Sequence, residues 1–262
     1  MRETILDTNV IGRIACSPGP EERKAAIARL AVAKGKNGHL VITPTVLSEI
    51  AATFAKEAIF DKLLDTLPVI CDGCLDREAP EILRLEVESD DPYSILTGRD
   101  LVPVTPQAIK DTVAEQEVQD FYADGGFGNA GMRHLLDALD PLRRMARHQL
   151  ESYREYVDAR RVDWLNGFLS LLQERGIIPK QEWDVEVLWQ KGTAWRFVTL
   201  VYLANEYRRL TQTQEKGEGC LTDLRIVIEA AYSHRLLTAD KEFAGCGALA
   251  NTVSAMPKIS AW

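Results

Sequence analysis

The sequence has no hydrophobic run long enough to cross a membrane. Its longest apolar run, residues 197–204, is far shorter than the roughly 20 residues that a spanning helix requires. The first residues lead directly into a predicted strand, without the basic segment and the apolar stretch of a secretion signal. We therefore expect a cytoplasmic protein with no membrane partner.

Cysteine and histidine are scarce, with five cysteines and four histidines in 262 residues. An odd number of cysteines without a secretion signal predicts reduced thiols rather than a disulfide framework. Cys71 and Cys74 have the two-residue gap of zinc sites and redox motifs, but no second pair of cysteines or histidines completes such a site. We interpret them as ordinary thiols in a turn, with zinc or redox chemistry as the alternative, and the histidines as structural.

Basic residues are outnumbered by acidic residues, and the formal net charge is -8. This balance argues against a protein that holds long nucleic acid by bulk attraction, although basic groups around an acidic metal site can still contact phosphates. Four arginines fall within about 40° of one another on one predicted helix. Either they contact RNA phosphates, or they form a solvated or salt-bridged face. They are Arg143, Arg147, Arg154 and Arg161.

Strands and helices alternate at both ends of the chain. Apolar runs predict strands at residues 4–6, 39–42, 67–70 and 236–238, with residues 251–255 as a candidate edge strand. Helices are expected at residues 21–34 and 58–66, and Thr43 and Pro44 form a helix start signal. Strands separated by helices indicate βα units and a parallel sheet. The sequence therefore predicts an α/β fold with a discontinuous core, residues 1–74 and 217–262.

The middle of the chain lacks this alternation and reads as a large all-helical insertion, residues 75–216. Helical runs are expected at residues 106–123, 132–162, 164–175 and 193–213. The segment GFGNAG (residues 126–131) matches a dinucleotide fingerprint, but no strand precedes it, so we interpret it as a hinge. Four tryptophans are expected to pack inside the insertion, with stacking on unpaired bases as the alternative. They are Trp164, Trp183, Trp189 and Trp195.

Four acids are placed where strands end or where the neighbouring helices begin. Asp7 and Asp240 each follow a predicted strand, and Glu49 lies in the helix after the second strand. Asp223 is at the start of the helix that precedes the terminal strand at residues 236–238. Ligands bind at the carboxyl ends of parallel strands, so these side chains should face one mouth. Carboxylates crowded together repel, and a divalent cation removes that cost. The alternative is a set of unrelated surface caps.

Four segments resemble motifs of PIN-domain nucleases, in the order of that family. ILDTNVI (residues 5–11) is similar to its opening motif, and PTVLSEI (residues 44–50) to the helix that supplies its second acid. TDLRIVIEAA (residues 222–231) followed by LLTADKEF (residues 236–243) is similar to its third-acid helix and final strand. The long middle segment departs from the family, whose compact members have only a short helical link there.

The resemblance implies a PIN-like three-layer α/β/α fold with a central, mostly parallel sheet. It implies that Asp7, Glu49, Asp223 and Asp240 are catalytic and bind Mg²⁺ or Mn²⁺. Asn9 and Thr238 are suited to holding a carboxylate in place, or alternatively to turn and cap chemistry.

The expected reaction is hydrolysis of RNA phosphodiester bonds to 5′-phosphate and 3′-hydroxyl ends, in a toxin-like or defence nuclease. RNA is the expected substrate, and the insertion is a candidate site for an inhibitor or partner protein. A homodimer remains open. One alternative is a catalytically silent PIN-like module that binds RNA or protein. Another is a haloacid-dehalogenase-type phosphatase, but that chemistry needs an aspartate where this chain has Asn9.

Overall fold

A single six-stranded sheet forms the centre of the molecule in the computed structural model. The structure describes residues 2–53, 57–97, 100–114, 152–211 and 220–262. The strand order is β4-β3-β2-β1-β5-β6, and all neighbours are parallel except β3 and β4, which are antiparallel. The strands are β1 (Arg2–Leu6), β2 (Gly38–Ile42), β3 (Gly73–Leu75), β4 (Leu101–Val102), β5 (Arg235–Thr238) and β6 (Lys258–Ala261). The fold is therefore α/β with a mostly parallel sheet, as predicted.

The two ends of the chain meet at the middle of this sheet. Ile5 of β1 pairs with Leu236 of β5, and Leu6 pairs with Leu237. These four side chains are buried. Continuous apolar residues are expected in parallel strands that are covered on both faces. The predicted discontinuous sheet, built from both chain ends, is thus confirmed.

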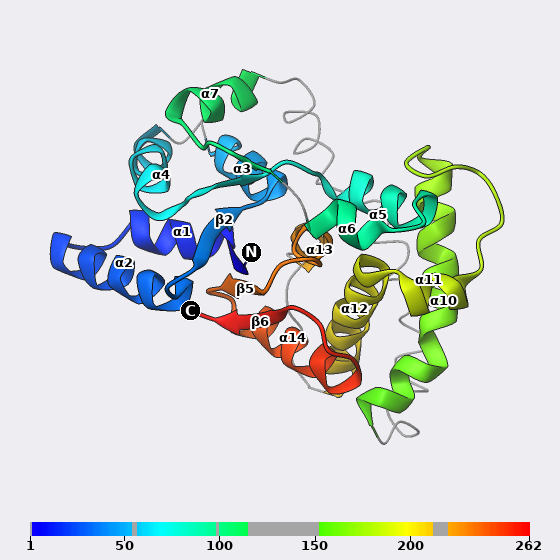
Figure 1. Ribbon diagram of the computed structural model, residues 1–262. Helices are drawn as coiled ribbons and strands as arrows, with labels where there is room; N and C mark the ends of the chain where they lie inside the picture. The colour runs from blue at the N-terminus through cyan, green and yellow to red at the C-terminus, as the bar shows by residue number, and fades with distance from the viewer. Residues whose placement is uncertain (1, 54–56, 98–99, 115–151, 212–219) are drawn as a thin grey trace.

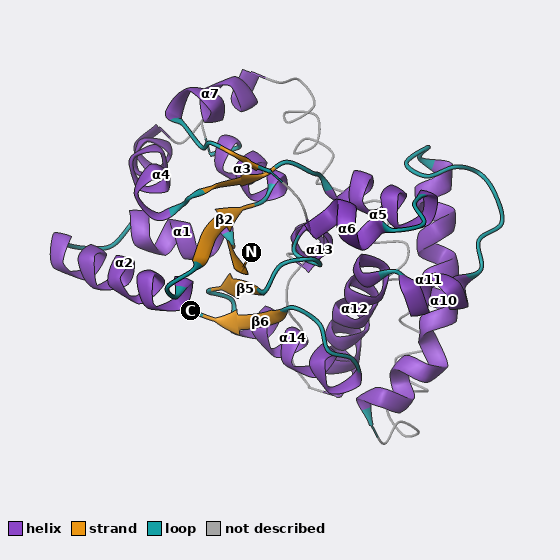
Figure 2. Ribbon diagram, in the orientation of Figure 1, coloured by secondary structure: helices purple, strands orange, loops and turns teal. Residues whose placement is uncertain are grey.

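Helices cover both faces of the sheet (Figures 1 and 2). Their bounds are α1 (Thr8–Ala15), α2 (Pro20–Lys34), α3 (Pro44–Ala51), α4 (Glu57–Ile70), α5 (Ala79–Glu88), α6 (Pro92–Thr97), α7 (Pro106–Ala114), α10 (Tyr153–Glu174), α11 (Val185–Lys191), α12 (Thr193–Thr211), α13 (Cys220–Glu229) and α14 (Lys241–Val253). The crossovers β1–β2 and β5–β6 run in opposite directions along the sheet. Right-handed connections then place α1 and α2 on one face and α14 on the other.

Helix α12 joins the middle of the chain to the sheet's helices. It packs against α13 and α14 on one side and against α10 and α11 on the other (Figure 1). Trp195, Phe197 and Leu200 on this helix are fully buried, and the buried residues of both chain ends and the middle form one hydrophobic cluster. The division into residues 1–74 with 217–262 and residues 75–216 stays a prediction.

The predicted strand at residues 67–70 is wrong, because these residues form the last turn of α4. Phe60, Leu63, Leu67 and Ile70 are buried at helical spacing, and this pattern continues past Pro68. The apolar run is therefore one face of a helix rather than a strand. The third strand follows it at Gly73–Leu75.

Three further expectations differ from the structure. Residues 251–253 belong to α14, whose apolar face repeats at Phe243, Cys246 and Ala250, and the edge strand is β6 instead. The middle segment is not entirely helical, because β4 adds an antiparallel strand to the sheet. The expected helix at residues 132–162 does not pass Ser152, where the backbone is extended and a capping box starts α10.

Among the helices that the structure describes, none combines the length and the apolar character needed to span a bilayer.

Candidate active site

The candidate site lies where the strand order reverses. β1 has β2 on one side and β5 on the other, and such switch points form ligand crevices at the carboxyl ends of the strands. Asp7 follows β1 directly and is only 3% exposed. Its backbone N–H donates to the carbonyl oxygen of Leu237 (3.0 Å), which ties it to β5.

The Thr238 hydroxyl connects the two chain ends at this point. It donates to Asp7 Oδ2 (2.6 Å) and accepts from the Asp240 backbone N–H (3.0 Å) and from Asn9 Nδ2 (3.2 Å). Asn9 Oδ1 in turn accepts from the Ala239 N–H (2.6 Å). Thr238 and Asn9 therefore lie where they can fix the Asp7 carboxylate and the loop after β5.

Glu49 reaches the site from α3. The hydroxyl of Thr8, the residue after Asp7, donates a hydrogen bond to Glu49 Oε2. The pKa of Glu49 is raised to about 7, mainly by burial and also by the negative charges of Asp7 and Glu229, while the bond from Thr8 acts in the lowering direction. Burial also raises the pKa of Asp7, although the Thr238 hydroxyl opposes this. Two desolvated carboxylates that repel each other thus lie close together at the carboxyl ends of the strands.

Asp240 lies on the loop that Thr238 holds, and its side chain begins α14. Oδ1 of Asp240 accepts from the backbone N–H groups of Glu242 (2.6 Å) and Phe243 (3.2 Å), which is N-cap geometry. Asp223 belongs to α13, but its side chain lies outside the described side chains. The structure therefore brings Asp7 and Glu49 together and links Asp240 to them through Thr238.

The two described members of the predicted arginine stripe, Arg154 and Arg161, bind partners other than these acids. Arg154 donates to the Thr252 carbonyl oxygen (3.0 Å), at the far end of α14 from Asp240. Arg161 pairs with Glu186 Oε2 (2.8 Å) and lies over the Trp189 ring. Arg143 and Arg147 lie outside the described residues, and a helix that starts after Ser152 cannot carry all four on one face.

The tryptophans of the middle segment pack within the protein. Trp195 is fully buried, and Trp164 stacks near Phe168 and Tyr202, with ring centroids 4.8 and 5.0 Å away. Trp183 donates from Nε1 to the Pro179 carbonyl oxygen at 3.4 Å. Trp189 is covered by the Arg161 guanidinium. Packing inside the protein, the expected interpretation, is confirmed.

Three residues of the site were not predicted from the sequence. Thr8 bonds Glu49, and exposed Arg13 donates from Nη2 to the Ala239 carbonyl oxygen (3.2 Å) beside Asp240. Glu229 lies fully buried between α3 and α5. Signals for two of them exist: Arg13 follows Asn9 by four residues on one helix face, and Glu229 is an acid within an otherwise apolar helix stretch.

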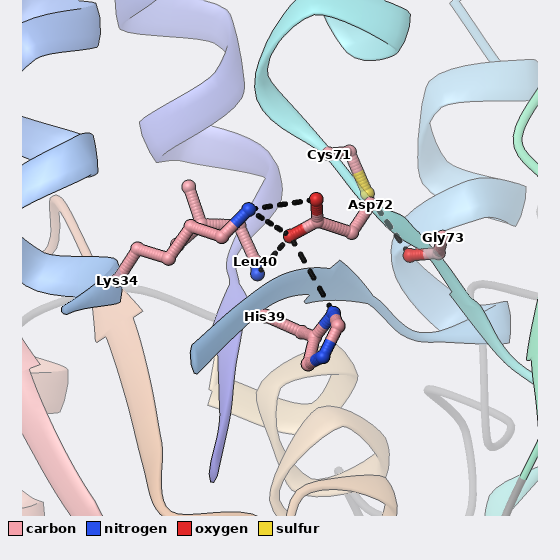
Figure 3. Close-up of polar contacts among 6 residues, drawn as sticks. All are labelled: Lys34, His39, Leu40, Cys71, Asp72 and Gly73. Carbon is pink, nitrogen blue, oxygen red and sulfur yellow. Dashed lines mark hydrogen bonds and ion pairs between the residues drawn. The ribbon is translucent and has the colours of Figure 1, made fainter. Parts of the chain in front are cut away.

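Cys71 lies in the short connection between α4 and β3 (Figure 3), and Cys74 lies within β3. Asp72 fixes this region, because its carboxylate accepts from Lys34 Nζ (2.7 Å) and the Leu40 N–H (2.8 Å). Burial raises the pKa of Cys71 to about 11 and that of Cys74 well above its usual value. Metal binding and nucleophilic attack require the thiolate form, which a raised pKa disfavours. The two pKa values therefore favour ordinary thiols over zinc or redox chemistry.

The donor set suits a hard divalent cation with few protein ligands. Mg²⁺ is commonly held by one or two carboxylates together with waters and substrate phosphates, and Asp7 and Glu49 supply two such groups. Burial raises both pKa values because it disfavours the charged carboxylates, and a bound cation would offset that cost. Among the side chains that the structure describes, no group of three or more His, Cys, Asp and Glu residues is arranged to hold a metal ion.

Protonation of Glu49 should make stability depend on pH. Its pKa is about 7 in the folded protein and 4.5 as the ordinary value, so between these pH values the folded state holds a proton that the unfolded state has lost. The free energy of unfolding should therefore fall as pH rises through this window, by on the order of 2 kcal/mol after allowance for solvent screening.

Denaturant titrations at pH 5 and pH 7.5 on wild type and Glu49→Gln measure this contribution. Gln cannot titrate but keeps an oxygen that can accept from Thr8, so the variant should show a shallower decline. Equal declines in both proteins would contradict the assignment.

Comparison with protein-family models found no match for this chain, and comparisons with curated proteins and with solved structures found none either.

Proposed function

We propose that this protein is a metal-dependent endoribonuclease with a PIN-like core. One observation carries the proposal: the carboxylates of Asp7 and Glu49 lie near each other at the switch point of a parallel sheet, joined through Thr8. Desolvated acids with raised pKa values in a cleft are typical of functional sites. The order of the acid-bearing segments along the chain, which resembles that of PIN-domain nucleases, supports the same function.

Asp7 and Glu49 would hold Mg²⁺ or Mn²⁺, with Asp223 and Asp240 as the further ligands, directly or through water. Such an ion supplies a polarised phosphate and a bound water of lowered pKa. Thr238 holds Asp7 Oδ2, and Thr8 holds Glu49 Oε2, so both carboxylates are oriented before substrate arrives. Asn9 fixes the Ala239 N–H and thereby the loop that carries Asp240.

Arg13 is the proposed phosphate contact at the rim of the site. It is exposed, and its guanidinium already lies at the Ala239 carbonyl, beside the proposed metal site. A guanidinium in this place could bind the backbone of RNA locally, which suits a chain whose net charge of -8 disfavours bulk attraction. The products would carry 5′-phosphate and 3′-hydroxyl ends.

We propose that the protein acts in the cytoplasm as a toxin-like or defence nuclease. The middle segment, residues 75–216, would select RNA or bind an inhibitor or partner protein, and a homodimer is compatible with the open edge strand β6.

The decisive experiment is to incubate purified full-length protein with end-labelled RNA and Mn²⁺. We expect cleavage that stops when EDTA removes the metal and resumes when excess Mn²⁺ is added back, because the acids cannot activate water without the cation. Cleavage that continues unchanged in EDTA would contradict the metal-dependent mechanism.

The second candidate is a PIN-like module that binds RNA or protein without cleaving it. The N-cap bonds of Asp240 favour this function. Oδ1 of this proposed metal ligand already accepts two backbone N–H groups at the start of α14. RNA binding in the presence of Mn²⁺ with no cleavage of any RNA tested would establish it. The haloacid-dehalogenase alternative is disfavoured, because Asn9 has an amide in the position of the required acid and uses it to hold the loop after β5.

A further inference from the structure

Glu229 is an acidic side chain in the most apolar part of α13. Its neighbours Ile226, Val227, Ile228 and Ala230 are all fully buried, and Glu229 itself is 0% exposed. A carboxylate without hydrogen-bond partners would be strongly destabilising in such a place. Its partners therefore explain why it is tolerated.

Two helix N-termini converge on this carboxylate. Oε1 accepts from the Thr45 hydroxyl (2.8 Å) and from the Ala79 backbone N–H (3.2 Å), and Oε2 accepts from the Thr45 backbone N–H (3.2 Å). The hydroxyl of Thr43, the N-cap of α3, is a further donor. Thr43 and Thr45 belong to the start of α3, whereas Ala79 begins α5. The positive ends of both helix dipoles favour the negative charge there.

This contact reaches the candidate site through α3. Thr45 lies one helical turn before Glu49, and Asp223 is on the same helix as Glu229. We propose that Glu229 is a positioning residue: by joining the first turns of α3 and α5 to α13, it sets the place of Glu49 in the crevice. This inference rests on the proposed metal-dependent function and deepens it.

Glu86 on α5 provides a matched control. It is also buried (8% exposed), and it accepts from the backbone N–H groups of Ala194 (2.8 Å) and Trp195 (3.1 Å) and from the Tyr232 hydroxyl. Glu86 thus clamps the start of α12 as Glu229 clamps the starts of α3 and α5. Its bonds lead to the start of α12 and to Tyr232 after α13, and not to the helix that carries Glu49.

The clamp itself is tested by amide hydrogen exchange on the full chain. Gln has one acceptor and one donor group, so Glu229→Gln loses the bond from the Thr45 N–H. We expect exchange in the first turns of α3 and α5 to become about tenfold faster in this variant. In Glu86→Gln the faster exchange should be confined to the start of α12. Unchanged exchange in α3 of Glu229→Gln would overturn the inference.

The consequence for the site is tested by titrating Mn²⁺ alone into the same proteins by calorimetry. Glu229→Gln should bind Mn²⁺ about tenfold more weakly than wild type, and Glu86→Gln should bind like wild type. Glu229→Asp keeps the carboxylate on a side chain that is shorter by one methylene group. The shorter side chain should contact its donors less well, so Mn²⁺ binding should weaken in this variant as well. Wild-type affinity in both Glu229 variants, or equal losses in Glu86→Gln, would overturn the positioning role.

Thr45→Val covers the case in which the Glu229 variants do not fold. It removes one donor to Glu229 while keeping the shape of the side chain, so we expect a smaller loss of Mn²⁺ affinity in the same direction. Wild-type affinity in a folded Thr45→Val protein would count against the inference. A wild-type protein that binds no Mn²⁺ would instead reject the proposed function, whatever the exchange data show for the clamp.

Discussion

Replacing Asp7 by Asn is expected to reduce Mn²⁺-dependent RNA cleavage by more than about a hundredfold. Substitution of residues that merely support metal ligands already costs about 10- to 100-fold, and Asp7 is the proposed central ligand. The amide is nearly the same size and can still accept from Thr238, so the fold should persist while the negative charge is lost. Initial rates of RNA cleavage, with circular dichroism as the check of folding, measure the effect.

Asp76 offers a matched control for this substitution. It follows β3 as Asp7 follows β1, at the same edge of the sheet, but it lies beside Arg77 (3.9 Å). Asp76→Asn should therefore cleave RNA at close to the wild-type rate. If Asp7→Asn keeps its activity, or if both variants lose it equally, Asp7 is not the metal ligand proposed here.

Replacing Trp195 by Ala should produce the largest loss of stability, about 3–5 kcal/mol in the free energy of unfolding. The side chain is fully buried, donates from Nε1 to the Leu83 carbonyl oxygen (3.3 Å) and lies edge-on to Phe168, with ring centroids 5.7 Å apart. Its removal leaves a large cavity between α12, α5 and α10 and takes one hydrogen bond from the Leu83 carbonyl oxygen. Denaturant titration of wild type and variant measures the difference.

The same experiment shows how far the middle of the chain and the sheet unfold together. Because α12 packs on α13 and α14, the variant should still unfold in one transition, with far-ultraviolet dichroism and fluorescence giving the same midpoint. Trp183→Ala, at a half-buried ring, should cost less. Separate transitions, or equal losses in the two variants, would contradict a shared core around Trp195.

The sequence predicts the parts of the fold in which one local pattern dominates. β1, β2 and β5 are short apolar runs between helical segments, and Thr43 with Pro44 starts α3 as expected. A strand is expected at residues 67–70 because the run is short and apolar and its proline is disfavoured inside a helix, whereas burial at Phe60, Leu63 and Leu67 selects a helix. Local pattern alone does not decide between these when tertiary packing supplies the larger free energy.

The candidate site was predictable to a similar degree. Asp7 and Glu49 could be placed near each other because parallel strands end at one edge of a sheet. The Thr8–Glu49 bond joins residues 41 positions apart, and the Thr45–Glu229 bond joins residues 184 positions apart. No periodicity within one helix or strand encodes such contacts. Asp240 shows a different difficulty. An aspartate that follows a strand and precedes a helix can be a metal ligand or an N-cap, and the sequence pattern is the same for both roles.

The position of β1 has a consequence for the newly made chain. Its Asp7 is bonded to Thr238, 231 residues later, and β1 lies between β2 and β5 in the finished sheet. At about 5–20 residues per second, a ribosome needs on the order of tens of seconds to make the intervening segment. During that interval one side of β1 has no partner strand, and the residues that β5 brings beside Asp7 have not yet been made. The unpaired backbone of β1 is then open to pairing with other chains, so chaperones would have to shield it until translation is almost finished.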